Sequence, residues 1–170
     1  MKKIFYIFAM LVSAALVSCK KDEAGGTNSE AMAGQWYVVA DAIDASGSVI
    51  AEDIYGAGRF MVLTYNTAAD NPSTIYLDDL GNFWEFKVRV NCDPVSKTFS
   101  VESANNESYE DCTVKVSNGK IVLNGATTPS GQPADYIEFD VVFSDDDYVG
   151  TVYDALRFSG WRYTGFVNDD

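Results

Sequence analysis

The sequence predicts an all-β protein, built as an up-and-down antiparallel barrel of about eight strands. Short runs in which apolar and polar residues alternate follow one another from residue 35 to residue 166. Clusters of Gly, Pro, Asn, Asp and Ser separate these runs, and no stretch has a helical period of useful length. A barrel with an apolar interior and a polar exterior fits this pattern and leaves no open sheet edge.

The clearest strand is expected at residues 83–92. Trp84, Phe86, Val88, Val90 and Cys92 alternate with polar residues and share one face, as in a half-buried strand. The Asn118-Gly119 pair favours a tight hairpin turn between two further strands. The remaining strands are expected at residues 35–41, 59–65, 97–102, 112–117, 120–124, 135–144, 148–154 and 156–166.

The N-terminus has the layout of an export signal. Lys2 and Lys3 supply positive charge, and residues 4–17 form an apolar run without charge. A membrane-spanning helix needs about 20 such residues, so this run is too short to cross a bilayer. It matches the hydrophobic region of a signal peptide, which we expect to end at residue 18.

Leu16-Val17-Ser18-Cys19 resembles the lipobox of bacterial lipoproteins. The resemblance implies cleavage before Cys19, a diacylglyceryl group on its sulfur and acylation of the new N-terminus, which together anchor a protein stably. Lys20 stands where lipoproteins retained in the inner membrane often have Asp, which implies the outer membrane, on its periplasmic or cell-surface face. The alternative is an ordinary secretory signal followed by a chance cysteine.

Three segments follow from this. Residues 1–18 are the expected signal peptide, 19–32 the lipidated cysteine and a Gly-, Asn- and Ser-rich tether, and 33–170 a single barrel domain. Removing residues 1–18 from the 170-residue chain leaves 152 residues with 10 basic and 25 acidic side chains, a net charge of −15. That balance argues against nucleic acid as a partner.

Histidine is absent from the chain. This excludes Ser-His-Asp and Cys-His catalysis and histidine-ligated metals, and no phosphate-binding or nucleophile-elbow motif occurs. The acidic clusters at Asp41–Asp44 and Asp145–Asp147 match no established calcium loop, and Asp is common in turns. The sequence therefore favours a protein without catalytic activity, metal or cofactor.

Cys92 and Cys112 remain once Cys19 is lipidated, in a compartment that permits disulfides. In a simple meander the two cysteines would lie at opposite ends of the sheet. The sequence leaves both a disulfide and two buried free thiols open.

Gly34-Gln35-Trp36 resembles the Gly-x-Trp that begins many lipocalins. In that family the tryptophan closes the barrel floor and a basic residue of the last strand packs on its ring. The resemblance assigns these structural roles to Trp36 and Arg162, with Arg157 as a second choice for the basic partner.

A wider set of motifs spans residues 34–39, 53–56, 58–61, 63–68, 79–84, 117–121, 125–131 and 163–166. This set resembles one family, the lipid-binding putative hydrolases, which are small lipocalin-like lipoproteins of gut anaerobes. The resemblance covers nearly all of the mature chain and implies the fold and a lipid ligand, but it supplies no catalytic motif.

The aromatic residues expected inside the barrel are the candidate ligand contacts. An eight-stranded barrel has room either to pack its own side chains or to hold one small ligand, and packing is the alternative role of these rings. The candidates are Phe60, Tyr65, Trp84, Phe86, Phe139 and Phe143.

The leading prediction is a membrane-anchored protein that binds a small apolar or amphipathic molecule, such as a lipid, without catalysis. Two alternatives stay open: a hydrolase that uses carboxylates or a serine, and a packed barrel that serves as an interaction module in a surface nutrient-uptake complex. A cavity, convergent carboxylates in a cleft or an exposed aromatic patch would distinguish the three.

Overall fold

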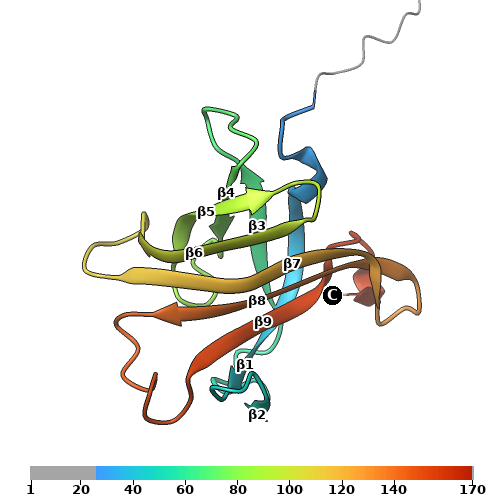
Figure 1. Cartoon of the computed structure of the whole chain (residues 1–170). Helices are drawn as coiled ribbons and strands as arrows, with labels where there is room; N and C mark the ends of the chain where they lie inside the picture. Colours follow the sequence, from blue (N-terminus) through green and yellow to red (C-terminus); the bar gives the residue numbers. More distant parts are fainter. Residues whose placement is uncertain (1–25, 170) are drawn as a thin grey trace, which may run out of the picture.

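The computed structural model describes residues 26–169 as nine strands and two short 3-10 turns (Figure 1). Consecutive strands pair antiparallel from β3 to β9, and β1 pairs with both β3 and β9, which closes the sheet. The expected eight-stranded barrel is therefore confirmed, and β2 is a short extra strand beside β1. The elements are η1 (Glu30–Met32), β1 (Gly34–Ile43), β2 (Val49–Ala51), β3 (Phe60–Asn66), β4 (Thr74–Asp78), β5 (Lys87–Asp93), β6 (Thr98–Asn105), β7 (Thr113–Thr127), β8 (Pro133–Phe143), β9 (Ala155–Arg162) and η2 (Val167–Asp169).

The prediction of a hairpin turn at Asn118-Gly119 is wrong. These residues form a bulge inside β7, where the register with β8 shifts between Ser117 and Lys120. A Cβ on Gly119 would lie 2.4 Å from the carbonyl oxygen of Phe99, so the close approach of β6 requires glycine. The segments expected at 112–117 and 120–124 are thus parts of one long strand.

Three further boundaries differ from the expectation. β4 was not predicted, because it is only five residues long and lies between two turn clusters. Residues 83–86 form a loop rather than the start of β5, and residues 148–154 form a loop with one isolated bridge, between Val149 and Tyr153. The nine expected segments become eight barrel strands, because the fusion within β7 and the loss of the 148–154 strand remove two and β4 adds one.

The core lies inside the barrel and consists of alternate residues of each strand. In β8, Ile137, Phe139 and Val141 are fully buried, whereas Tyr136 and Glu138 face outward. The same alternation holds along β3, β5 and β9. Hydrophobic burial of this single interior surface is what selects the strand registers.

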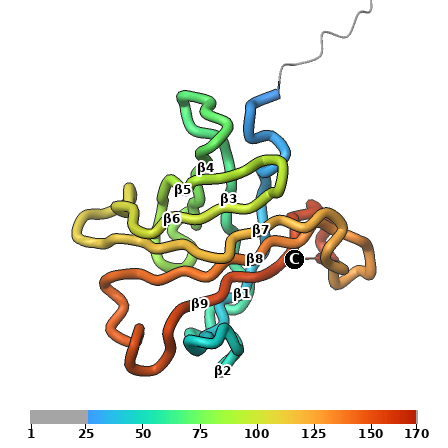
Figure 2. The backbone as a smooth tube through the Cα atoms, viewed as in Figure 1, coloured from blue at the N-terminus to red at the C-terminus, as the bar shows by residue number. Residues whose placement is uncertain are grey.

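The two ends of the barrel differ (Figure 2). Because consecutive strands are antiparallel, the connections after β1, β4, β6 and β8 meet at one end, which we call the mouth. The mouth loops are residues 44–59 (including β2), 79–86, 106–112 and 144–154. The other end, the floor, holds η1, the remaining turns and the C-terminal segment.

The domain begins earlier than expected. Ser29 and Met32 are fully buried, and Asn28 hydrogen-bonds Asp70 through its backbone nitrogen at 2.9 Å. The tether expected to run to residue 32 therefore ends near residue 27, because the floor needs Met32 as part of its packing. The expected signal peptide and Cys19 lie outside the described residues. Within residues 26–169 no helix has the length and apolar character needed to cross a membrane.

Candidate functional site

The floor of the barrel is sealed by Trp36. Its ring is fully buried, and its Nε1 donates a hydrogen bond of 2.8 Å to Thr64, whose hydroxyl donates in turn to the Met32 carbonyl at 2.5 Å. The guanidinium carbon of Arg162 lies 4.5 Å from the Trp36 ring centroid. The Trp36 ring therefore fills the floor end of the barrel with a side chain whose polar atom is hydrogen-bonded.

A continuous series of aromatic rings runs from the mouth into the interior. Phe83 stacks on Phe60 with centroids 4.7 Å apart, and Trp84 stacks on Phe143 at 4.8 Å. Deeper rings continue the series, with Phe158 at 5.1 Å from Phe60 and 5.2 Å from Phe139. Phe83 and Trp84 come from a loop, whereas the Phe60, Phe139, Phe143 and Phe158 rings stand on strands of the sheet.

We call loop 79–86 the plug, because it carries Phe83, Trp84 and Phe86 into the mouth. Its shape is held by Asp79, whose buried carboxylate accepts hydrogen bonds from five backbone N–H groups at 2.7–3.1 Å, those of residues 81, 83, 84, 85 and 86. Leu80 and Glu85 have φ of +54° each. Such conformations are costly for residues other than glycine, so the Asp79 carboxylate sustains a strained loop.

Asp145 and Asp146 tie the plug and the other mouth loops together. Asp145 accepts hydrogen bonds from Trp84 Nε1 at 3.1 Å, Tyr109 Oη at 2.6 Å and Cys112 Sγ at 3.2 Å. Asp146 accepts hydrogen bonds from the hydroxyls of Tyr55 and Tyr153. Every mouth loop thus reaches one of two adjacent carboxylates.

These contacts determine the protonation states of Asp145 and Tyr109. Burial acts to raise the pKa of Asp145, but the hydrogen bonds from Tyr109, Cys112 and Trp84 outweigh it, and the pKa is lower than usual. Burial and the hydrogen bond to Asp145 raise the pKa of Tyr109. Asp145 is therefore a carboxylate, and Tyr109 a neutral donor, throughout the physiological range.

An open hollow of about 420 Å³ lies beside the plug. It is lined by Gly81, Phe83, Trp84, Glu85 and Tyr109. The Glu85 side chain is exposed and makes no ion pair among the described residues. The hollow is thus an open site on the plug, where three aromatic residues accompany one carboxylate that forms no ion pair with the described part of the chain.

The mouth is strongly acidic. Its loops contain twelve carboxylates and one basic residue, Arg59. The floor segments 26–33, 67–73, 94–97, 128–132 and 163–169 contain three carboxylates and one lysine. The mouth carboxylates are Asp44, Glu52, Asp53, Asp79, Glu85, Glu107, Glu110, Asp111, Asp145, Asp146, Asp147 and Asp154.

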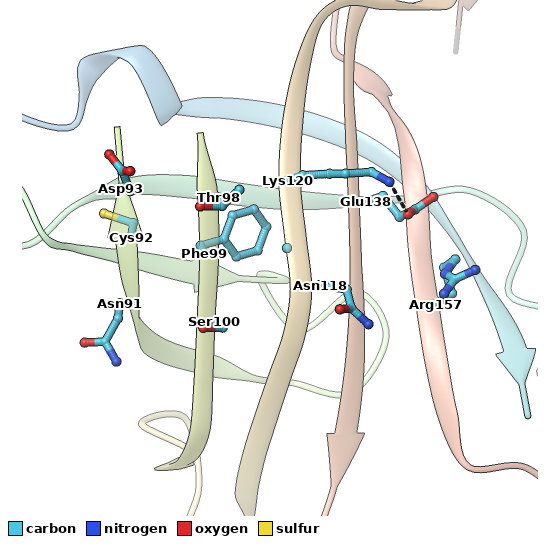
Figure 3. A pocket seen from close by; sticks show the side chains of 11 residues that line it. Asn91, Cys92, Asp93, Thr98, Phe99, Ser100, Asn118, Lys120, Glu138 and Arg157 are labelled. Atoms are coloured by element: carbon cyan, nitrogen blue, oxygen red, sulfur yellow. Dashed lines mark ion pairs between the residues drawn. The ribbon is translucent and has the colours of Figure 1, made fainter. Parts of the chain in front are cut away.

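A second hollow, of about 670 Å³, lies on the outer wall across β5 to β9 (Figure 3). Polar side chains line it, and Lys120 forms an ion pair of 2.8 Å with Glu138. Asp140 binds both Arg157 at 2.8 Å and Asn118 at 2.7 Å. These charged groups pair with one another on the outer wall, whereas the series of stacked aromatic rings begins at the mouth.

The structure brings together five of the six aromatic residues singled out from the sequence. Phe60, Phe86, Phe139 and Phe143 are buried in the ring series, and Trp84 lies half-buried above it. The prediction that the Tyr65 ring lies inside the barrel is wrong. It faces outward on β3, where its hydroxyl donates to Asp78 at 2.7 Å, because its parity along the strand is opposite to that of Phe60.

Both remaining cysteines are free thiols in the structure. Cys92 lies near the floor end of β5, and its Sγ donates to the Pro72 carbonyl at 3.5 Å. Cys112 lies at the mouth against Asp145. The antiparallel meander places the two cysteines at opposite ends of the barrel, so they do not come close enough to form a disulfide.

Sequence reasoning missed Phe83, Tyr55, Tyr109 and Tyr148 as mouth residues. The Tyr55 ring adjoins those of Phe83 and Tyr148, since its centroid lies 5.6 Å from both Phe83 and Trp84 and 6.4 Å from Tyr148. The alternation of residues 83–92 suggested one uninterrupted strand, although the Asp79-Leu80-Gly81-Asn82 cluster marked a turn just before it. The other tyrosines lie in loops, where no periodic pattern indicates a shared site.

Comparison with known proteins decides the family. The model of the family described as "lipid-binding putative hydrolase" matches residues 21–167. The chain belongs to this family. The match includes every strand of the barrel, and no curated protein matches the chain. A family of lipid-binding proteins and a barrel fold agree with lipid binding as the role of this chain.

Proposed function

We propose that the mature protein is a non-enzymatic binding protein, anchored in the outer membrane by lipid on Cys19, that takes one small apolar or amphipathic molecule at the barrel mouth. A lipid fits this description. The family match and the closed barrel support binding of a lipid. The position of the site rests on the plug.

The observation that carries the proposal is the origin of the Phe83 ring. It stacks on Phe60 of the core yet belongs to a loop, so it can leave without breaking a strand ladder, while the Trp84 indole stays hydrogen-bonded to Asp145. Its departure would uncover Phe60 and Phe158. An alkyl chain of a ligand can replace the lost contacts, at roughly 0.8 kcal/mol for each buried CH₂ group.

Displacement of the Phe83 ring would also explain how a filled barrel can bind a ligand. When the binding-competent state is a minor population, the observed affinity is reduced by that fraction. A change that empties part of the plug should therefore raise affinity. Phe83→Ala is such a change, because it removes the ring that stacks on Phe60.

The first test is native mass spectrometry of residues 20–170, which include all described residues of the barrel, purified without detergent and followed by organic extraction. A reproducible adduct of a few hundred daltons that is lost on unfolding is the expected result. A neutral dodecyl amphiphile, titrated below its micelle concentration, provides the second test, read by calorimetry.

We expect Phe83→Ala to bind the neutral amphiphile severalfold more tightly than the unchanged chain. Tyr76→Ala is the matched control, since Tyr76 is an aromatic residue on the outer face of β4. Equal affinities for the two variants would remove the plug from the mechanism. Absence of both an adduct and amphiphile binding would overturn the proposed function and favour a packed barrel that acts through its surface.

A further inference from the structure

We infer that the ligand of the mouth carries a positively charged head group: the hollow beside the plug is built for an ammonium-bearing amphiphile, not for a fatty acid or another anionic lipid. The inference rests on the proposed function and names the ligand class of the same site. Three independent features of the mouth support it.

The first feature is the aromatic lining. Trp84 and Tyr109 line the hollow, and both donate hydrogen bonds to Asp145, which positions their rings beside one another. Tyr55 adjoins Trp84 at 5.6 Å, and Tyr148, about half exposed, extends the aromatic surface. Ring faces attract quaternary ammonium groups, and tryptophan does so most strongly.

The second feature is an unpaired carboxylate in the hollow. Glu85 lines it between Trp84 and the Phe86 backbone, and no basic residue pairs with its carboxylate among the described residues. Its φ of +54° is imposed by the plug, whose backbone nitrogen at residue 85 is held by Asp79 at 3.0 Å. A defined backbone thus places a free negative charge next to an indole ring.

The third feature is the direction in which the nearby cations point. Arg59, the one basic residue of the mouth loops, reaches away to the Trp161 ring, 5.2 Å from its centroid, and to the Asp169 carbonyl at 3.3 Å. Lys87 lies over Tyr76 on the outer wall, 4.9 Å from the ring centroid. Neither of these two side chains turns toward the hollow, so an anionic head group there would meet Glu85 without their help.

The test compares four amphiphiles with the same dodecyl chain on residues 20–170, each below its micelle concentration: trimethylammonium, phosphocholine, the carboxylate and a neutral maltoside. Calorimetry gives the affinities at two salt concentrations. We expect trimethylammonium and phosphocholine to bind more tightly than the maltoside, and the carboxylate to bind most weakly. Salt should weaken the trimethylammonium affinity more than the maltoside affinity.

The outcomes separate the two proposals. If none of the four binds, the proposed function fails. If the maltoside binds but trimethylammonium binds no more tightly, the proposed function stands and the charge inference is overturned. Tighter binding of the carboxylate would overturn it as well.

Paired variants distinguish a site from general attraction to an acidic protein. Glu85→Gln should lower the trimethylammonium affinity about fivefold and the maltoside affinity by a smaller factor, since a fivefold change corresponds to about 1 kcal/mol, the interaction of two unit charges about 4 Å apart in water. Glu102→Gln removes the same charge from the outer wall, where Glu102 is 90% exposed. An equal loss in both variants would show attraction by net charge alone and would refute the assignment to the hollow.

Discussion

The guanidinium carbon of Arg162, on the last strand, lies 4.5 Å from the centroid of the Trp36 indole, on the first strand. The same guanidinium donates to the Ala33 carbonyl at 2.9 Å and pairs with Asp135 at 3.0 Å. This one side chain therefore links the chain entering the barrel, the strand pair that closes it and the neighbouring β8.

Trp36→Ala should destabilise the domain by about 3–5 kcal/mol, because it removes a fully buried aromatic side chain and leaves a cavity at the floor. Arg162→Ala should cost less, about 1–2 kcal/mol, through loss of the contact with the ring and of its hydrogen bonds. Urea unfolding measures both. A loss below about 1 kcal/mol for Trp36→Ala would contradict its role in sealing the barrel.

Asp79→Asn should destabilise the plug, because the amide would turn an NH₂ group toward backbone N–H groups that now donate to a carboxylate oxygen. We expect a loss of roughly 2–3 kcal/mol in urea unfolding and faster hydrogen exchange at residues 83–86. Asp93→Asn, in an exposed turn at the floor, is the control and should change stability less. Unchanged exchange in the plug would show that other contacts hold it.

Residues 20–170 prepared under oxidising conditions should retain two titratable thiols after unfolding, and a reductant should leave the melting temperature unchanged. In the folded state Cys92 should react faster than Cys112, which is only 3% exposed. Burial raises the pKa of both thiols, so both rates should increase as the pH rises above 8. A mass two daltons below the reduced value would reveal a disulfide instead.

Asp169 should make stability depend on pH at the acid end. The Ser130 and Thr164 hydrogen bonds lower its pKa to about 2. A group whose pKa is depressed by folding stabilises the native state above its ordinary pKa, 3.8, and the contribution disappears as the pH falls toward 2. The difference in stability between the unchanged chain and Asp169→Asn should therefore be present at pH 6 and shrink near pH 2. A difference independent of pH would argue against this linkage.

Cys19→Ala, in the full-length chain expressed in a bacterial host, should move the protein from the membrane fraction to the soluble fraction, because it removes the proposed acylation site. Fractionation with detection of the barrel domain measures the shift. Cys92→Ala is the control, since it leaves the lipobox intact. Continued membrane association of Cys19→Ala would refute the anchoring proposal.

The barrel could be predicted from the sequence because its determinants are local. Alternation with period two in stretches such as residues 135–144 places one face inside and the other in water, whatever the neighbouring strand. The positions of Trp36 and Arg162 near the two ends of the barrel chain also place them on strands that must meet when the sheet closes. These features required no knowledge of long-range contacts beyond closure itself.

The mouth was decided by tertiary structure. Asn118-Gly119 has the composition of a hairpin turn but forms a bulge, because β6 approaches so closely that the chain continues as one strand. Trp84 and Phe86 continue the alternation of β5 in sequence, yet five hydrogen bonds to Asp79 fold residues 83–86 into a plug. The pattern of apolar and polar residues indicates which side chains are buried. The shape of a loop, however, depends on contacts with residues that are distant in the chain. For that reason the sequence by itself determined the barrel, its resemblance to lipocalins implied the sealed floor, and only the folded chain determined which rings, and which unpaired carboxylate, meet at the mouth.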